Sequence, residues 1–137
     1  DSEPSPAGRA GGAKAARATT ADNRKLLDEG ERLLRAERFV EAREIFTKLT
    51  KSRRDKAAAL VGLAEIAFQE KHYGDAVRSA KLAASAGGGV RARVLLGDAH
   101  FRLNQFNEAA RAYEDALKLD PGNASARSGL ALANKRM

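Results

Sequence analysis

The residues of this chain that could do chemistry are few and widely separated. Its 137 residues include no cysteine and two histidines, His72 and His100. Zinc sites combine three or four His, Cys, Asp or Glu ligands, and neither histidine has another histidine or a cysteine near it in the sequence. Without cysteine there is also no disulfide and no thiolate nucleophile. We therefore expect no bound metal, and we interpret both histidines as ordinary core or surface residues.

A triple glycine is the other feature with chemical potential. Gly87-Gly88-Gly89 precedes a predicted helix, where backbone N–H groups could hold an anion. It lacks the Lys-Ser/Thr pair that gives a phosphate loop its specificity, so we interpret it as a linker. The sequence contains no HExxH pattern and no nucleophile elbow, and solvated helix faces account for the carboxylates. We expect no enzymatic activity, no cofactor and no small-molecule substrate.

The charge balance is strongly basic. Lys and Arg number 25 against 18 Asp and Glu, for a formal net charge of +7. The densest run, Lys51 to Lys56, is diluted by Asp55, and the other basic residues are spread along the chain. This distribution favours a solvated surface over a nucleic-acid patch. No apolar run approaches the roughly 20 residues of a membrane helix.

Apolar residues recur at helical spacing from about residue 22 to the C-terminus. Four such faces are traced by Leu26, Leu27, Leu33 and Leu34, by Phe39, Ala42, Ile45, Phe46 and Leu49, by Leu60, Leu63, Ala64, Ala67 and Phe68, and by Tyr73, Ala76, Val77 and Ala80. Nothing alternates as a half-buried strand would. Residues 1–21, rich in Pro, Gly, Ala and Ser, are predicted to be a flexible or disordered tail. Thr20 or Asp22 would then cap the first helix.

A period underlies these helices. The small residues Gly30, Ala64, Gly97 and Ala131 are separated by 34, 33 and 34 residues. Twelve residues after each of the first three comes an alanine, at positions 42, 76 and 109, and three residues before that alanine comes an aromatic, at positions 39, 73 and 106. Small residues let paired helices approach closely, and the aromatic fills the wedge near their turn. One hairpin cannot bury both its faces, so neighbours must stack.

The third unit carries a family resemblance. Leu96-Gly97-Asp98-Ala99, Phe106-Asn107-Glu108-Ala109 and the stretch from Tyr113 to Pro121 together resemble a tetratricopeptide repeat. The resemblance implies an all-α, right-handed superhelical stack of antiparallel helix hairpins. It divides the chain into repeats at about 23–56, 57–89 and 90–123 and a capping helix at 124–137. Arg54 and Gly88 stand where the family has proline, and Ala80 stands where Phe46 and Tyr113 are aromatic.

The resemblance also implies a binding surface, the concave face lined by the first helix of each repeat. In register, that face carries a row of carboxylates beside a row of apolar residues. The candidate site residues are Glu31, Glu65 and Asp98, then Leu34, Phe68 and Phe101, and also Arg102. Glu31 and Asp98 have an arginine four residues later and could be neutralised within their helices. Glu65 has no such partner, which makes it the best candidate for contact. Phe68 and Phe101 could equally be core.

The expected function is a scaffold or adaptor module that binds a protein segment. One branch of the family grips the C-terminal carboxylate of chaperones with Lys and Asn. The corresponding places here hold Leu27, Glu31, Glu65, Val94 and Asp98, so that clamp is absent. An acidic row favours a basic or amphipathic partner segment. Binding of nucleic acid or an anionic surface, and self-association through the terminal helix, remain open alternatives.

The setting of the module is the least determined part. The chain starts at Asp1, and we expect it to be a piece of a larger protein. The Ala, Gly and Arg content suggests a bacterial source. We expect a cytoplasmic location, with a periplasmic or membrane-tethered parent chain as the open alternative.

Overall fold

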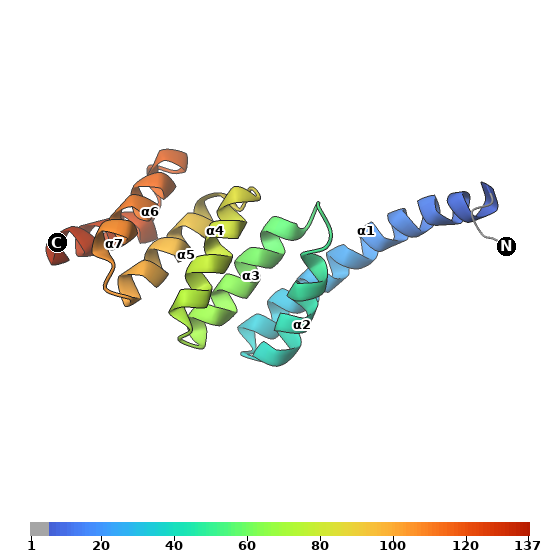
Figure 1. Cartoon of the computed structure of the whole chain (residues 1–137), viewed down its shortest axis with the longest axis horizontal. Coiled ribbons are helices and arrows are strands. Elements are labelled where there is room, and N and C mark those ends of the chain that lie inside the picture. Colours follow the sequence, from blue (N-terminus) through green and yellow to red (C-terminus); the bar gives the residue numbers. More distant parts are fainter. Residues whose placement is uncertain (1–5) are drawn as a thin grey trace.

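The protein is a stack of helices. The computed structural model describes residues 6–137, with side chains from residue 20 onward. The described chain has seven helices and no strand (Figure 1). They are α1 (Pro6–Arg35), α2 (Phe39–Leu49), α3 (Lys56–Gln69), α4 (Tyr73–Ser85), α5 (Gly89–Arg102), α6 (Phe106–Leu119) and α7 (Ala124–Arg136). None of these helices combines the length and apolar character needed to cross a membrane.

The helices form two layers. Each helix packs against the next along the chain, so that α1 with α2, α3 with α4 and α5 with α6 form hairpins. Contacts also join α1 to α3, α3 to α5 and α5 to α7, which places these four helices in one layer and α2, α4 and α6 in the other. The predicted all-α stack of three hairpins and a capping helix is confirmed.

The start of α1 differs from the sequence-based expectation. Residues 1–5 of the predicted tail lie outside the described residues. Residues 6–21 are helical and continue α1 without a break near residue 22, so Thr20 and Asp22 lie inside the helix rather than at its cap. The segment projects away from the rest of the stack (Figure 1). Alanine, the best helix former, is frequent here and offsets the cost of Gly11-Gly12, about 1 kcal/mol per glycine.

The three hairpin turns share one backbone motif. Glu37, Lys71 and Asn104 adopt the left-handed conformation, with φ of 60°, 67° and 61°. The residue after each donates its N–H to a carbonyl five residues back, as from Arg38 to Leu33 at 2.9 Å. This closure of a helix C-terminus usually employs glycine. Because two of these positions hold Glu and Lys, and only the third holds Asn, which also tolerates this conformation, the sequence signal for the motif is weak.

Two aromatic rings anchor the stack between pairs of glycines. Phe46, fully buried, would be 2.9 Å from a Cβ added at Gly30 and 2.6 Å from one added at Gly62. In the third repeat, Tyr113 has Gly97 and Gly129 in the same places, at 2.6 and 2.4 Å. The small residues therefore admit a ring from the opposite layer.

In the second repeat the small residue lies in the outer helix and the large residue lies in the next inner helix. Its outer helix carries Ala80, fully buried, where the others have an aromatic. The next inner helix carries Leu95 at the register position of Gly62 and Gly129, packed against the buried cluster that includes Ala83 and Ala92.

The prediction for the capping helix was wrong in one respect. Ala131 is exposed, and Gly129 is the residue of α7 that meets Tyr113.

Candidate functional site

A groove with a volume of about 980 Å³ runs between α1 and α3 and reaches the turn before α5. Its floor is apolar and includes the buried residues Leu34, Phe46, Val61 and Gly62. Because Phe46 belongs to the outer layer, its ring reaches the groove floor only where Gly30 and Gly62 admit it. We call this feature the α1–α3 groove. An apolar floor of this size with polar walls is typical of ligand and peptide sites.

The groove walls carry charges of both signs. Two carboxylates, Glu31 and Glu37, are exposed and make no ion pair with any described residue. Arg35 and Arg54 line the same groove. Glu65 forms an ion pair with Arg91 of the next repeat, with only 17% of the Glu65 side chain exposed. The expectation that Glu65 lacks a partner was therefore wrong, because its partner comes from α5 rather than from its own helix.

Asp98 is also engaged within the fold. It accepts a hydrogen bond of 2.5 Å from the hydroxyl of Tyr113. Burial raises the pKa of Asp98, and the hydrogen bond and the charge of Arg102 offset this only in part. Burial and the same hydrogen bond raise the pKa of Tyr113. Phe46 and Ala80 have no hydroxyl at the equivalent position, so this internal use of the carboxylate is confined to the third repeat.

The raised pKa of Asp98 gives a pH prediction. The native state favours its protonated form, so its contribution to stability is full below the unfolded pKa and is lost as pH rises through the folded pKa. Asp98→Asn cannot ionise and should gain stability relative to the unchanged chain between about pH 3 and pH 7. Urea unfolding at both pH values measures this difference. Asp28→Asn, at an exposed site, is the control. A difference that is constant or shrinks with rising pH contradicts the prediction.

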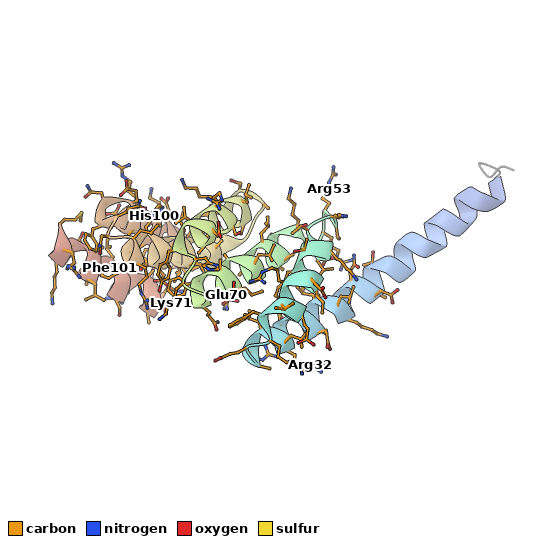
Figure 2. The ribbon with its side chains drawn as sticks, turned by 60° about the horizontal axis from the view of Figure 1, so that its bottom comes forward. Arg32, Arg53, Glu70, Lys71, His100 and Phe101 are labelled. Carbon is orange, nitrogen blue, oxygen red and sulfur yellow. The ribbon has the colours of Figure 1, made fainter. Side chains whose placement is uncertain are left out.

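The predicted aromatic residues lie beyond the groove. Phe68 contacts Tyr73 edge to face with ring centroids 5.3 Å apart, and Phe101 contacts Phe106 in the same way at 5.2 Å. Arg102 donates a hydrogen bond to the Tyr73 hydroxyl at 2.8 Å. Figure 2 shows Phe101 in the C-terminal half of the stack, far from Arg32 on α1.

The predicted site residues are thus divided by the structure. Three of them, Glu31, Leu34 and Glu65, line the α1–α3 groove. Phe68, Asp98, Phe101 and Arg102 do not. Sequence reasoning missed other lining residues, which come from turns or from a neighbouring repeat: Glu37, Arg54, Gln69 and Arg91. The left-handed backbone conformation of Glu37 and the stacking of neighbouring hairpins bring these side chains to the groove.

The histidines have structural partners. His100 is buried and its Nδ1 lies 2.7 Å from Oε1 of Gln105. Nδ1 of His72 lies 3.6 Å from Oε1 of Glu70, which also pairs with Arg43 (Glu70 is labelled in Figure 2). Within the described part of the chain, no group of three or more His, Asp or Glu side chains is arranged to hold a metal ion.

Solved structures share this architecture. The tetratricopeptide-repeat domain of Sgt2 from Aspergillus fumigatus has a TM-score of 0.78 at 19% identity, covering 84% of this chain and 78% of that one. The second such domain of human RPAP3, solved in complex with the HSP70 peptide SGPTIEEVD, has a TM-score of 0.72 at 24% identity. The match covers 78% of this chain and 90% of that one. PcrH, in complex with the chaperone binding region of PopB, has a TM-score of 0.71 at 19% identity. The match covers 85% of this chain and 95% of that one. At these identities the likeness shows the fold.

Sequence comparison assigns the family. A model described as tetratricopeptide repeat matches residues 27–90, and a second, described as TPR repeat, matches residues 97–137. No curated protein matches the chain. The two matches together extend over parts of all three hairpins and over the whole capping helix, in agreement with the period of small residues and with the stack itself. The chain belongs to the tetratricopeptide-repeat family.

Proposed function

We propose that this chain is a non-enzymatic protein-interaction module that holds a segment of a partner protein in the α1–α3 groove. The observation that carries the proposal is the apolar floor formed by Leu34, Phe46, Val61 and Gly62, open between charged walls. Such a floor can bury the apolar side chains of a segment. Charged groups along the walls then select its register and sequence.

The partner segment is amphipathic and carries basic side chains. Glu31 and Glu37 lie on the α1 wall and make no ion pair with a described residue, so they are free to bind a cation. Two of the three arginines that line the groove leave this preference in place. Arg91 is engaged by Glu65, and Arg54 precedes α3 at the end of the groove away from Glu37. Arg35 is the nearest cation in sequence to these carboxylates.

Two structural neighbours support peptide binding by this architecture. The human RPAP3 domain is solved with an HSP70 peptide and PcrH with a region of PopB. The HSP70 peptide, SGPTIEEVD, ends in acidic residues. Glu31 and Glu37 would repel a tail of that kind, which supports a different partner class for this groove.

Filling the groove should abolish binding. Ala58 is exposed and lines the groove in the first turn of α3. Ala58→Trp therefore places a large ring over the groove floor without disturbing the core. Peptides selected from a random displayed library on the unchanged chain are the probe, with affinity measured by calorimetry. We expect Ala58→Trp to weaken them at least about tenfold, equivalent to about 1.4 kcal/mol.

Ala131→Trp is the matched control, because Ala131 is an exposed alanine outside the groove lining. Its affinity should equal that of the unchanged chain. Equal binding by Ala58→Trp would refute the groove as the site. Selected peptides rich in Asp and Glu would refute the basic partner class. Affinity for random DNA that falls steeply with salt would support the nucleic-acid alternative, and sedimentation that depends on concentration would support self-association.

A further inference from the structure

Arginine side chains cover aromatic pairs at two successive repeat junctions. The guanidinium carbon of Arg102 lies 5.1 Å from the ring centroid of Phe68 and 5.6 Å from that of Tyr73. The guanidinium carbon of Arg136 lies 6.0 Å from Phe101 and 4.8 Å from Phe106. In each case the arginine comes from the following repeat. We call each arginine with its aromatic pair a rung.

The two rungs stand in the same register. Phe68 and Phe101 are the twelfth residues of their repeats, counted from position 57 or 90, and Tyr73 and Phe106 follow five residues later. Arg102 and Arg136 are one repeat apart and each lies near the end of the next inner helix. A cation within about 6 Å of a ring centroid is attracted by the ring's electron-rich face. The rung is thus a repeated inter-repeat contact of this fold.

The first junction has the aromatic face but lacks the cation. Leu34 and Phe39 occupy the places of Phe68 and Tyr73, and Gln69 occupies the place of Arg102. Phe39 is half-buried against the first core cluster, and no arginine of the described residues stacks on it as on the other two pairs. Gln69 is exposed and lines the α1–α3 groove together with Leu34. The incomplete rung therefore meets the groove at Leu34 and Gln69, with half-buried Phe39 just outside the groove lining.

Two carboxylates accompany the incomplete rung. Glu37 lies between Leu34 and Phe39 in the turn after α1, and Glu31 lies one helical turn before Leu34. Both line the groove, and neither makes an ion pair with a described residue. A cation bound where Leu34 and Gln69 meet the groove would share the groove with these two negative charges. The arginines of the completed rungs form no ion pair with a described residue, although the charge of Arg102 acts on Asp98.

We propose that an arginine side chain of the partner segment completes the first rung, stacking on Phe39 beside Leu34 and binding Glu31 or Glu37. This inference rests on the proposed function and specifies the basic residue that the groove selects. Arginine fits better than lysine because its planar guanidinium can stack on a ring and bind a carboxylate through its edge at the same time. The partner's arginine would stand where Arg102 and Arg136 stand in the later repeats.

The test uses a guanidinium probe on the full chain. N-acetyl-arginine N-methylamide is titrated at millimolar concentrations, and the ring resonances of Phe39 and Phe106 are followed by NMR. The neutral isostere, N-acetyl-citrulline N-methylamide, is titrated in parallel. We expect the arginine probe to shift the Phe39 resonances with saturation, and to leave Phe106, already covered by Arg136, much less affected. Citrulline should give little shift at either ring.

Gln69→Arg supplies the missing cation from within the chain and should compete with the probe. We expect its apparent affinity for the arginine probe to fall about fivefold, the factor that corresponds to an exposed cation–π contact. Asn107→Arg adds the same charge at an exposed site outside the groove and should leave the affinity unchanged. Gln69→Met keeps the length of the side chain without a charge and should still bind the probe.

Equal shifts with citrulline, or unchanged affinity in Gln69→Arg, would overturn the proposal. Either result is distinguishable from failure of the groove itself. If Ala58→Trp still abolishes binding of the selected peptides while the arginine probe leaves Phe39 unshifted, the groove binds a segment but the rung does not select arginine. If Ala58→Trp has no effect on those peptides, the proposed function has failed.

Discussion

Replacing Phe46 with alanine is expected to lower the free energy of unfolding by about 3 to 5 kcal/mol. The ring is fully buried, and two of the positions in contact with it, Gly30 and Gly62, are glycines. Neither glycine has a side chain that could move into the space left by the ring. The cavity therefore persists and adds to the lost transfer free energy. Urea unfolding followed by circular dichroism measures the change, provided that the slope with denaturant stays constant.

The second repeat suggests how the loss can be reversed. There the chain combines Ala80 in the outer layer with Leu95 at the register position of Gly62. Adding Gly62→Leu to Phe46→Ala reproduces this combination in the first repeat and should recover a large part of the lost stability. In the unchanged chain Gly62→Leu should destabilise, because even its Cβ would lie 2.6 Å from the Phe46 ring. The two changes are therefore expected to be strongly non-additive. Additive effects would show that the glycines do not serve to admit the ring.

The sequence predicted the stack well because its determinants are local and periodic. The residues Gly30, Ala64 and Gly97, spaced by one repeat, are buried in the structure. The capping helix was harder to predict. Ala131 continues the period but is exposed, since α7 has no outer helix of its own to cover that position. Gly129, which is partly buried, packs against Tyr113 instead, at a register position that holds Gly62, Leu95 and Gly129 in turn along the chain.

The site was predicted less completely, for a physical reason. Register alone identified Glu31, Leu34 and Glu65 as groove residues, because helical periodicity fixes the face on which a residue lies. It could not identify their partners. Glu65 pairs with Arg91, which is 26 residues away, and Tyr113 reaches Asp98 across a hairpin. Such pairs depend on which side chains are long enough to span two helices, and helical spacing of three or four residues carries no information about them.

The second large effect is expected from Gly129→Leu in the capping helix. A Cβ at this position would lie 2.4 Å from Cζ of Tyr113. The ring cannot move away easily, because it is buried and its hydroxyl is hydrogen-bonded to Asp98. Overpacking of this kind costs about 1 to 3 kcal/mol, and α7 relieves it most readily by leaving its place on α5 and α6. We expect the change to undock α7.

Hydrogen exchange distinguishes undocking from general destabilisation. An isolated helix shorter than about 12 to 15 residues is marginal in water, so α7, with 13 residues, should lose amide protection once detached. Protection in α1 to α4 should remain, because they do not contact α7. Gly74→Leu is the matched control, since nothing lies within 4 Å of a Cβ added there. Uniform loss of protection in all helices would contradict local release of the cap.

Detachment of α7 has a consequence for the arginine–aromatic rungs. Arg136 belongs to α7, so Gly129→Leu should uncover Phe101 and Phe106 and create a second incomplete rung at the other end of the stack. The arginine probe should then shift the Phe106 resonances, which it leaves much less affected in the unchanged chain. The places of Glu31 and Glu37 are held in the third repeat by Asp98, which is engaged by Tyr113, and by the neutral Asn104, so this binding should be weaker than at Phe39. A Phe106 shift that grows in Gly129→Leu and stays absent in Gly74→Leu would therefore show that an uncovered aromatic pair is sufficient to attract the guanidinium, and that the carboxylates of the first repeat add affinity to it.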